Sequence, residues 1–373
     1  GAAVSAAQAF YSCRKLSTVG AGLFTDCGRI TNFLGAFSLC YALSSIPENL
    51  FEGCSAATNF YETFYSCQAL VALPDSLFAA CEGTDNISLY GTFAYCAALV
   101  SIPDGLFSAI RSRISTAQVA FRGCSSLTTV PSGLFADATN CGNIDSAFLD
   151  CTALSTVGDE VFSGCTALTS AHNVFSGCLT LTTTGDRLLA GCTALKYVSG
   201  VFEGCSALTS TGGALLSGCT SLTSATGLFS ACRRLVTVPE DTFRDCGALI
   251  SAGETFAGCT SLTGIPDALF ADCPSLKSAE KMFYGCSALV SVPPDIVKPG
   301  DTVGSVNWMF RECSSLAVDI NTLFTQTFPE GYSLAYLFDG CSNVTGSKSE
   351  FLAKFPSPVT SAYCFDDCPL LTD

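Results

Sequence analysis

The hydrophobic positions of this chain repeat with a fixed spacing. Phenylalanine, cysteine and leucine follow one another at three-residue intervals in the pattern F-x-x-C-x-x-L, as in residues 202–208. The cysteines of this pattern, called the ladder cysteines, are Cys13, Cys40, Cys67, Cys96, Cys124, Cys151, Cys178, Cys205, Cys232, Cys259, Cys286, Cys313, Cys341 and Cys368. They are 27 residues apart, except for one interval of 29 and two of 28, and only Val344 replaces the leucine. Such a period predicts a solenoid, because one unit cannot bury its apolar face alone and must stack on its neighbours.

Each repeat divides into two similar halves. The first half has the pattern F-x-x-C-x-x-L-x-x-I-P in residues 93–103 and 256–266, which predicts a tight helical turn that leads into a short strand. The proline, or a glycine in other repeats, ends that strand. The second half carries its own phenylalanine and cysteine, as in residues 269–279. We therefore expect about fourteen stacked coils of about 27 residues, with short parallel strands, short helical turns and inward side chains on both sides.

The unbroken repeat predicts one elongated domain over residues 1–373. Some coils depart from the pattern, near residues 105–123, 132–147, 293–310 and 322–337, and the terminal coil covers 342–373. Loops on a rigid solenoid either carry recognition or are tolerated insertions. No signal peptide is present, and the start at Gly1 resembles a trimmed mature or expressed form, so the missing leader is uninformative about export and the question of removed flanking segments stays open.

Charge and hydropathy exclude two classes of partner. The chain has 17 basic and 32 acidic residues, a net charge of −15. This field repels nucleic acid and anionic lipid. No apolar run reaches the roughly 18 residues that predict a membrane helix. We therefore expect no nucleic-acid partner and no membrane insertion of this segment.

The 24 cysteines have a spacing that does not favour disulfides. Equivalent cysteines in successive coils should lie about 4.7–4.9 Å apart with parallel side chains, whereas a disulfide requires closer Cβ atoms and a torsion near 90°. We predict buried thiols that pack as small hydrophobic groups. Because there is no C-x-x-C and His172 is the only histidine, we expect no metal site and no cofactor.

Acidic residues often follow the proline or glycine that ends a strand. They either bind calcium or cap the next turn, and the spacing typical of calcium loops is missing, which favours capping. These residues are Glu48, Asp75, Asp104, Asp159, Asp186, Glu240 and Asp267.

The repeated motif F-x-G-C-S-A-L-T-S, as in residues 202–210, resembles the BspA-like leucine-rich repeats of Bacteroidetes, treponemal and mycoplasma surface proteins. The resemblance covers about residues 4–373. It implies a leucine-rich-repeat solenoid, a cell-surface or secreted location, adhesive or host-binding roles, and no catalytic residues. The phenylalanine and cysteine of the second half depart from the family pattern. They leave open whether one or both sides of each coil carry strands.

Two sets of surface positions are candidate binding surfaces. A Ser/Thr-rich pair after the ladder leucine, as in Thr128-Thr129, is either a hydrogen-bonding stripe or an ordinary strand surface. A second set, five and six residues before each ladder cysteine, varies more and should face solvent; we call it the variable column. Its notable members are Tyr61, Glu62, Tyr90, His172, Asn173, Glu254, Glu280, Lys281, Asn307, Trp308, Tyr336 and Tyr363. Aromatic and polar side chains of this kind are typical of interaction hot spots and of sugar platforms, although they can also simply close gaps between coils.

Catalysis has little support in the sequence. A nucleophile needs an oriented base, but His172 has no motif around it, and no phosphate-binding loop is present. We therefore expect a non-catalytic surface or secreted protein that binds a host or bacterial surface protein or glycan. The alternatives are a carbohydrate-capturing component of a glycan-uptake system and a rigid spacer domain.

Overall fold

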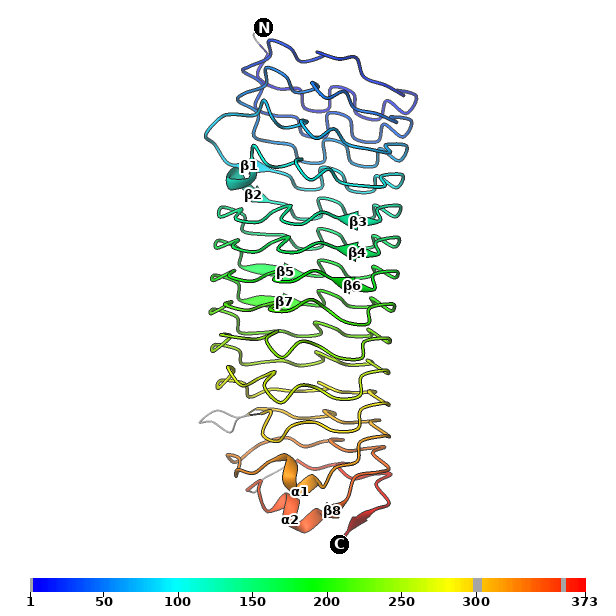
Figure 1. Cartoon of the computed structure of the whole chain (residues 1–373), viewed down its shortest axis with the longest axis vertical. Coiled ribbons are helices and arrows are strands. Elements are labelled where there is room, and N and C mark those ends of the chain that lie inside the picture. The colour runs from blue at the N-terminus through cyan, green and yellow to red at the C-terminus, as the bar shows by residue number, and fades with distance from the viewer. Residues whose placement is uncertain (1–2, 298–303, 357–359) are drawn as a thin grey trace. The chain divides into compact units, whose positions relative to one another are not determined.

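The computed structural model describes residues 3–297, 304–356 and 360–373. Residues 298–303 of the predicted irregular segment 293–310, and residues 357–359 of the terminal coil, lie outside the described residues. Two compact units are present, Gly1–Leu195 and Lys196–Asp373. Within each unit the chain winds in coils that stack on one another (Figure 1).

Regular elements are short and lie between turns. In the first unit they are β1 (Ile87–Ser88), the 3₁₀ helix η1 (Arg111–Arg113), β2 (Ile114–Thr116), β3 (Thr129–Val130), β4 (Thr156–Val157), β5 (Ser170–His172) and β6 (Thr183–Thr184). In the second unit they are β7 (Tyr197–Ser199), α1 (Ile320–Leu323), β8 (Gly346–Ser347), α2 (Lys348–Leu352) and β9 (Leu371–Thr372). The parallel strands and short helices agree with the predicted leucine-rich-repeat fold.

Both sides of the coil carry strands, which answers the question that the sequence left open. In the first unit β3, β4 and β6 pair in parallel, and they follow the ladder leucines. The parallel pair β1–β2 lies instead before the next ladder phenylalanine. Isolated parallel bridges from Asn32 to Asn59 and from Asn59 to Ser88 extend that second side. In the second unit β8 pairs in parallel with β9.

Backbone hydrogen bonds between coils continue through the turns. The Phe33 N–H donates to the Asn59 carbonyl and the Phe37 N–H to the Thr63 carbonyl, both at 2.8 Å. Equivalent bonds recur along each unit. Buried backbone amides need hydrogen-bond partners, and these bonds between coils supply them outside the strands. The core is therefore continuous although the regular strands are short.

The turn at F-x-x-C contains left-handed residues. The residue five places before each ladder cysteine has φ between 49° and 63°, from Gln8 to Tyr363. Glycine, which adopts this conformation freely, stands there only at residues 35, 91, 200 and 227. The others carry side chains, including the β-branched Val119 and the bulky Trp308. A left-handed residue with a Cβ costs about 1–2 kcal/mol, so this position of the variable column is strained in most coils.

The strain can be measured at Ser146, which has φ 57°. We expect Ser146→Gly to raise the free energy of unfolding by about 0.5–1 kcal/mol, because relief of the strain exceeds the entropy that glycine loses on folding. Urea unfolding followed by circular dichroism measures it. The control is Ser125→Gly, at an exposed position without a positive φ, which should be slightly destabilising. Equal destabilisation by both changes would contradict the proposed strain.

The phenylalanine ladder predicted from the sequence is confirmed within each unit. In the first unit the rings of Phe93 and Phe121 have centroids 5.3 Å apart, and those of Phe121 and Phe148 are also 5.3 Å apart. In the second unit the Phe256 and Phe283 rings stack at 5.5 Å. These side chains are almost fully buried. They form the apolar centre against which both halves of each coil pack.

The ladder cysteines are free thiols that also donate hydrogen bonds. The Cys151 Sγ lies 3.2 Å from the Phe121 carbonyl oxygen of the preceding coil, and the Cys259 Sγ lies 3.1 Å from the Phe229 carbonyl oxygen. The cysteines of the second half make the same contact. The thiol therefore satisfies a buried carbonyl as well as filling space, a role that the prediction of a small hydrophobic group did not include.

The basic irregular segment near residues 105–123 packs back on the fold. It contains η1, and the Arg113 Nε donates to the Asp85 carbonyl at 2.9 Å while its Nη1 donates to the Cys81 carbonyl. The helix α1 leads into the segment near 322–337 and is capped by the side chain of Asp319. The Asp159 carboxylate accepts from the Asp186 N–H at 2.8 Å, so this acid bonds the equivalent turn of the next coil rather than the turn that follows it in its own coil.

In the part of the chain that the structure describes, no helix is long and apolar enough to cross a bilayer. Within the same residues, no group of three His, Cys, Asp or Glu side chains has an arrangement that could hold a metal ion.

Candidate functional site

The variable column lies at the surface of both units. Of its twelve notable members, Tyr363 is 56% exposed and the other eleven are half-buried. Because many of them occupy the left-handed position of the turn, their side chains leave the coil at equivalent places and can meet across neighbouring coils. The structure brings two groups of them into contact.

The larger group is a continuous row in the second unit. The Lys281 Nζ lies 3.2 Å from the Glu254 Oε1 and 5.5 Å from the centroid of the Trp308 ring. Trp308 stacks on Tyr336 at 5.7 Å, and Tyr336 stacks on Tyr363 at 4.8 Å. Five residues that are 27 or 28 positions apart in sequence thus form one surface.

The smaller group lies in the first unit. Tyr61 and Tyr90 stack with their centroids 4.4 Å apart, and Glu62 is the left-handed residue beside Tyr61. The pKa of the Glu62 carboxyl is raised by desolvation. The pKa of the Tyr61 hydroxyl is also raised, first by desolvation and then by the negative charge of Glu62.

Other members of the column do not join either group. The backbone N–H of His172 donates to Asp145 Oδ1 at 2.8 Å, and Asn173 follows it in the turn. The side chain of Asn307 accepts a hydrogen bond from the Ala335 N–H at 2.8 Å, so it helps to hold the next coil. Glu280 is half-buried in the same column.

A second row of surface residues, missed in the sequence analysis, faces the variable column. It lies two places before each ladder cysteine, and we call it the opposite rim. Its members include Tyr65, Arg122, Tyr284 and Arg311, and it varies as much as the variable column does. The same 27-residue comparison could have found it. Sequence alone did not show that the two rows enclose space.

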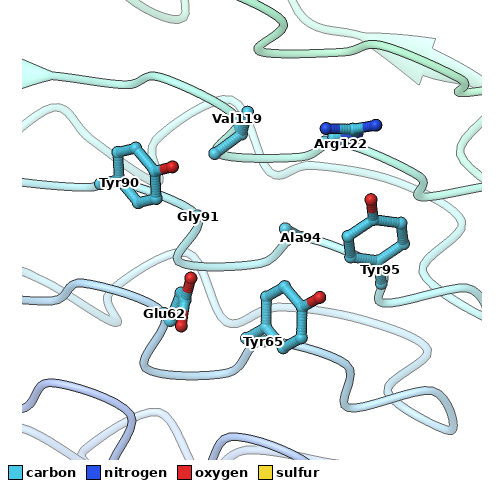
Figure 2. A pocket seen from close by; sticks show the side chains of 8 residues that line it. All are labelled: Glu62, Tyr65, Tyr90, Gly91, Ala94, Tyr95, Val119 and Arg122. Atoms are coloured by element: carbon cyan, nitrogen blue, oxygen red, sulfur yellow. The ribbon is translucent and has the colours of Figure 1, made fainter.

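A pocket between these rows lies in the first unit, and we call it the Glu62 pocket (Figure 2). It has a volume of about 190 Å³, and Gly91 and Ala94 form its floor. Its walls are Glu62, Tyr65, Tyr90, Tyr95, Val119 and Arg122. The Arg122 guanidinium lies over the Tyr95 ring, 5.7 Å from its centroid, and Tyr65 meets Tyr95 edge-on at 5.4 Å.

Another pocket, the Glu254 pocket, is in the second unit and has a volume of about 470 Å³. It lies between the same two rows. Its lining includes Glu254, Lys281 and Trp308 of the variable column and Tyr284 and Arg311 of the opposite rim. The charges of its acid and its lysine compensate each other in the Glu254–Lys281 ion pair.

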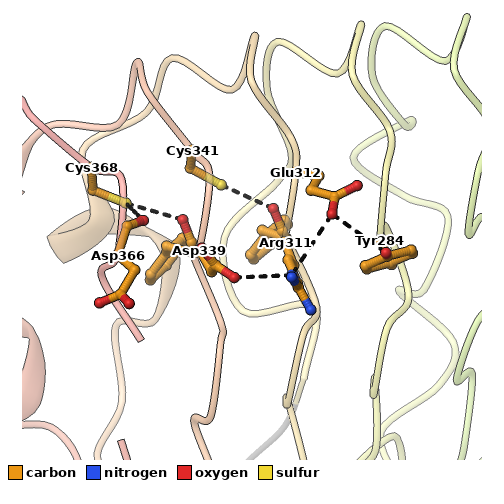
Figure 3. Close-up of polar contacts among 9 residues, drawn as sticks. Tyr284, Arg311, Glu312, Asp339, Cys341, Asp366 and Cys368 are labelled. Carbon is orange, nitrogen blue, oxygen red and sulfur yellow. Dashed lines mark hydrogen bonds and ion pairs between the residues drawn. The ribbon is translucent and has the colours of Figure 1, made fainter. Parts of the chain in front are cut away.

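A polar network extends this pocket toward the end of the second unit (Figure 3). The Arg311 Nε lies 2.9 Å from Asp339 Oδ2 and 3.8 Å from Glu312 Oε1, and the Tyr284 hydroxyl donates to Glu312 at 3.4 Å. Desolvation raises the pKa of Asp339, although the charge of Arg311 acts in the opposite direction. Arg311 also lies over the Tyr336 ring at 5.3 Å. This arginine is therefore held in place from several sides.

The Ser/Thr stripe uses its hydroxyls within the fold. The Thr128 Oγ1 donates to the Val100 carbonyl at 3.2 Å, and the Ser155 Oγ donates to the Thr128 carbonyl at 3.1 Å. Each bond reaches one coil back. These side chains reinforce the contact between coils, which makes the stripe a weaker candidate than the two pockets.

Known proteins share the repeat. A family model described as the BspA type leucine rich repeat region matches in six copies, over the overlapping stretches 7–199 and 128–277. Solved structures similar to this chain include a leucine-rich repeat protein from Bacteroides ovatus, 21% identical, with 92% of this chain and 86% of that chain covered and a TM-score of 0.27. A leucine rich cell surface protein from Faecalibacterium prausnitzii is 20% identical over 71% of this chain and 76% of its own, with a TM-score of 0.20.

A leucine-rich repeat protein from T. pallidum is 16% identical, with 62% of this chain and 81% of that chain covered and a TM-score of 0.25. The comparison with curated proteins found no match. The family model spans well over half of the chain and agrees with the ladder of phenylalanine, cysteine and leucine seen in both units. The chain therefore belongs to the BspA-type leucine-rich repeat family.

Proposed function

We propose that this protein is a non-catalytic scaffold, at the bacterial cell surface or secreted, that adheres to a host or bacterial surface protein. In this proposal residues 1–373 act as a single leucine-rich-repeat domain, and the partner binds over the variable column and the opposite rim. The observation that carries the proposal is the continuous row Glu254–Lys281–Trp308–Tyr336–Tyr363. Family membership supports a binding scaffold.

The composition of this row fits a protein interface. Tryptophan, tyrosine and arginine dominate interaction hot spots, because they bury large areas and lose little entropy. Here the rings are already stacked on one another, and Arg311 is already fixed by its ion pair with Asp339. Binding would therefore cost little side-chain conformational entropy. Several of these residues also occupy strained left-handed positions, where glycine would be more stable.

The stacking favours a protein over a glycan at Trp308. Sugar rings pack on an exposed aromatic face, but one face of Trp308 is covered by Lys281 of the preceding coil and the other by Tyr336 of the following coil. Tyr336 is likewise covered by Trp308 and Tyr363. The rings present mainly their edges to a partner, which suits side chains and peptide groups better than a sugar platform.

The test is a binding panel of extracellular-matrix and mucus proteins, with a glycan array in parallel. We expect at least one protein to bind, and we expect Trp308→Ala to weaken that binding by about 2 kcal/mol or more, as for a central hot spot. The matched control is Val236→Ser, an exposed apolar residue of the Ser/Thr stripe, which should leave affinity unchanged. Binding that tolerates Trp308→Ala but fails in Val236→Ser would move the interface to the stripe and contradict the proposal.

A further inference from the structure

The two pockets are built on the same plan but differ in how their charges are compensated. In each, a glutamate of one coil (Glu62 or Glu254) and an arginine two coils later (Arg122 or Arg311) stand at equivalent positions of the repeat. In the Glu254 pocket the coil between them supplies Lys281, whose ammonium pairs with the glutamate at 3.2 Å.

In the Glu62 pocket the equivalent of Lys281 is Gly91, so the cation is missing. Among the described residues the Glu62 carboxylate makes no ion pair and no hydrogen bond. Its pKa is raised by desolvation alone, with no nearby positive charge acting against the rise. A half-buried carboxylate in this state would be stabilised by an ammonium group.

The arginine of the Glu62 pocket also lacks its counter-ion. Arg311 pairs with Asp339 of the next coil, whereas Leu149 stands at that position after Arg122. In the described chain the Nε atoms of both arginines are buried without a hydrogen bond, but only Arg311 has a carboxylate beside it, in the ion pair with Asp339 at 2.9 Å. The pocket thus has an unpaired carboxylate on one side, a guanidinium without a counter-ion on another and tyrosine rings between them (Figure 2). Tyrosine faces also attract cations.

We propose that the Glu62 pocket receives a lysine side chain of the protein partner, whose ammonium takes the place that Lys281 fills in the Glu254 pocket. The alkyl chain lies over Ala94 between Tyr65 and Tyr90, and the carbonyl of the lysine accepts from Arg122. This inference deepens the proposed function and rests on it for the identity of the ligand as part of a protein. The net charge of −15 favours approach of such a basic segment.

The repeat itself provides the test variants. Glutamine already occupies the left-handed position at Gln8, lysine at Lys281 and glycine at Gly227, so Glu62→Gln, Gly91→Lys and Lys281→Gly place residues that this turn accepts. A Cβ at Gly91 would lie 3.7 Å from Val119 Cγ2 and 3.1 Å from Glu62 Cγ, a tight contact that places an introduced lysine beside Glu62 after a small shift of the flexible glutamate side chain.

The probe is Nα-acetyl-lysine methylamide, observed by saturation-transfer NMR with the full chain, and the norleucine analogue is the matched control ligand. We expect the lysine probe to bind and the norleucine probe to fail. Glu62→Gln should weaken binding at least about tenfold, because a charge-assisted contact is lost. Gly91→Lys should abolish binding, and Glu82→Gln, which changes an exposed carboxylate outside both rows, should leave it unchanged.

The decisive variant is Glu62→Gln combined with Lys281→Gly. Removing Lys281 leaves Glu254 unpaired beside Trp308, so this double variant should regain binding of the lysine probe. Equal binding of lysine and norleucine, retained binding in Glu62→Gln, or no recovery in the double variant would each overturn the proposal. If the probe fails while a partner from the panel still binds through Trp308, only the lysine assignment falls and the proposed function stands.

Discussion

Replacing Phe121 with alanine is expected to lower the free energy of unfolding of the first unit by about 3–5 kcal/mol. The ring is fully buried and stacks at 5.3 Å on both Phe93 and Phe148. Part of the loss is the transfer free energy of the removed ring, and the rest is the cost of the cavity that remains. The neighbouring coils cannot close this cavity, because backbone hydrogen bonds between coils fix their spacing.

The matched control is Phe10→Ala in the same unit. Phe10 occupies the same motif position, but it is half-buried, and in the described residues its ring stacks only on Phe37, at 5.1 Å. Urea unfolding followed by circular dichroism should therefore show a much smaller loss for Phe10→Ala. Similar losses for the two variants would mean that two-sided stacking contributes little to stability.

Native protein treated with an alkylating reagent at about pH 8 is expected to react at Cys13, more slowly at Cys27, and at no other thiol until it unfolds. Cys13 is exposed and Cys27 half-buried, whereas the other cysteines are buried. Burial raises the pKa of Cys54 to about 11 and that of Cys96 to about 12. A raised pKa lowers the fraction of reactive thiolate at a given pH, so both access and ionisation slow the reaction.

Mass spectrometry of the native and the urea-unfolded protein measures this difference. All 24 thiols should become modified after unfolding without a reductant. Rapid native labelling of Cys151, whose thiol bonds the Phe121 carbonyl, would contradict the packing of the ladder. Disulfides found in the unfolded protein would contradict the free thiols.

The fold could be predicted because its core is repeated chemistry. A phenylalanine, a cysteine and a leucine at constant spacing can be buried together only if successive coils align, as the rings of Phe93, Phe121 and Phe148 do. The left-handed geometry of the turns could be predicted only in part. Glycine indicates a left-handed residue at Gly35 and Gly91, but Val119 and Trp308 adopt the same conformation, and no residue preference predicts it for them.

The variable column could be predicted as a set, but not its internal contacts. Trp308 and Tyr336 meet because their side chains leave equivalent turns in the same direction. His172 and Asn307 belong to the same column, yet the structure shows them in contacts that hold coils together. The pockets were not predictable from one row alone, since each is enclosed by both rows together, and the Glu62 pocket also needs the small Gly91 and Ala94, which stand in those rows one coil after Glu62.

The proposed site depends on aromatic side chains of successive coils lying on one another, and the only tryptophan allows this to be measured directly. In protein deuterated except at tryptophan and tyrosine, the indole protons of Trp308 should show nuclear Overhauser cross-peaks to a tyrosine ring, and Tyr336→Leu should remove them. Absence of any tryptophan–tyrosine cross-peak, or a cross-peak that survives Tyr336→Leu, would contradict the stacked surface.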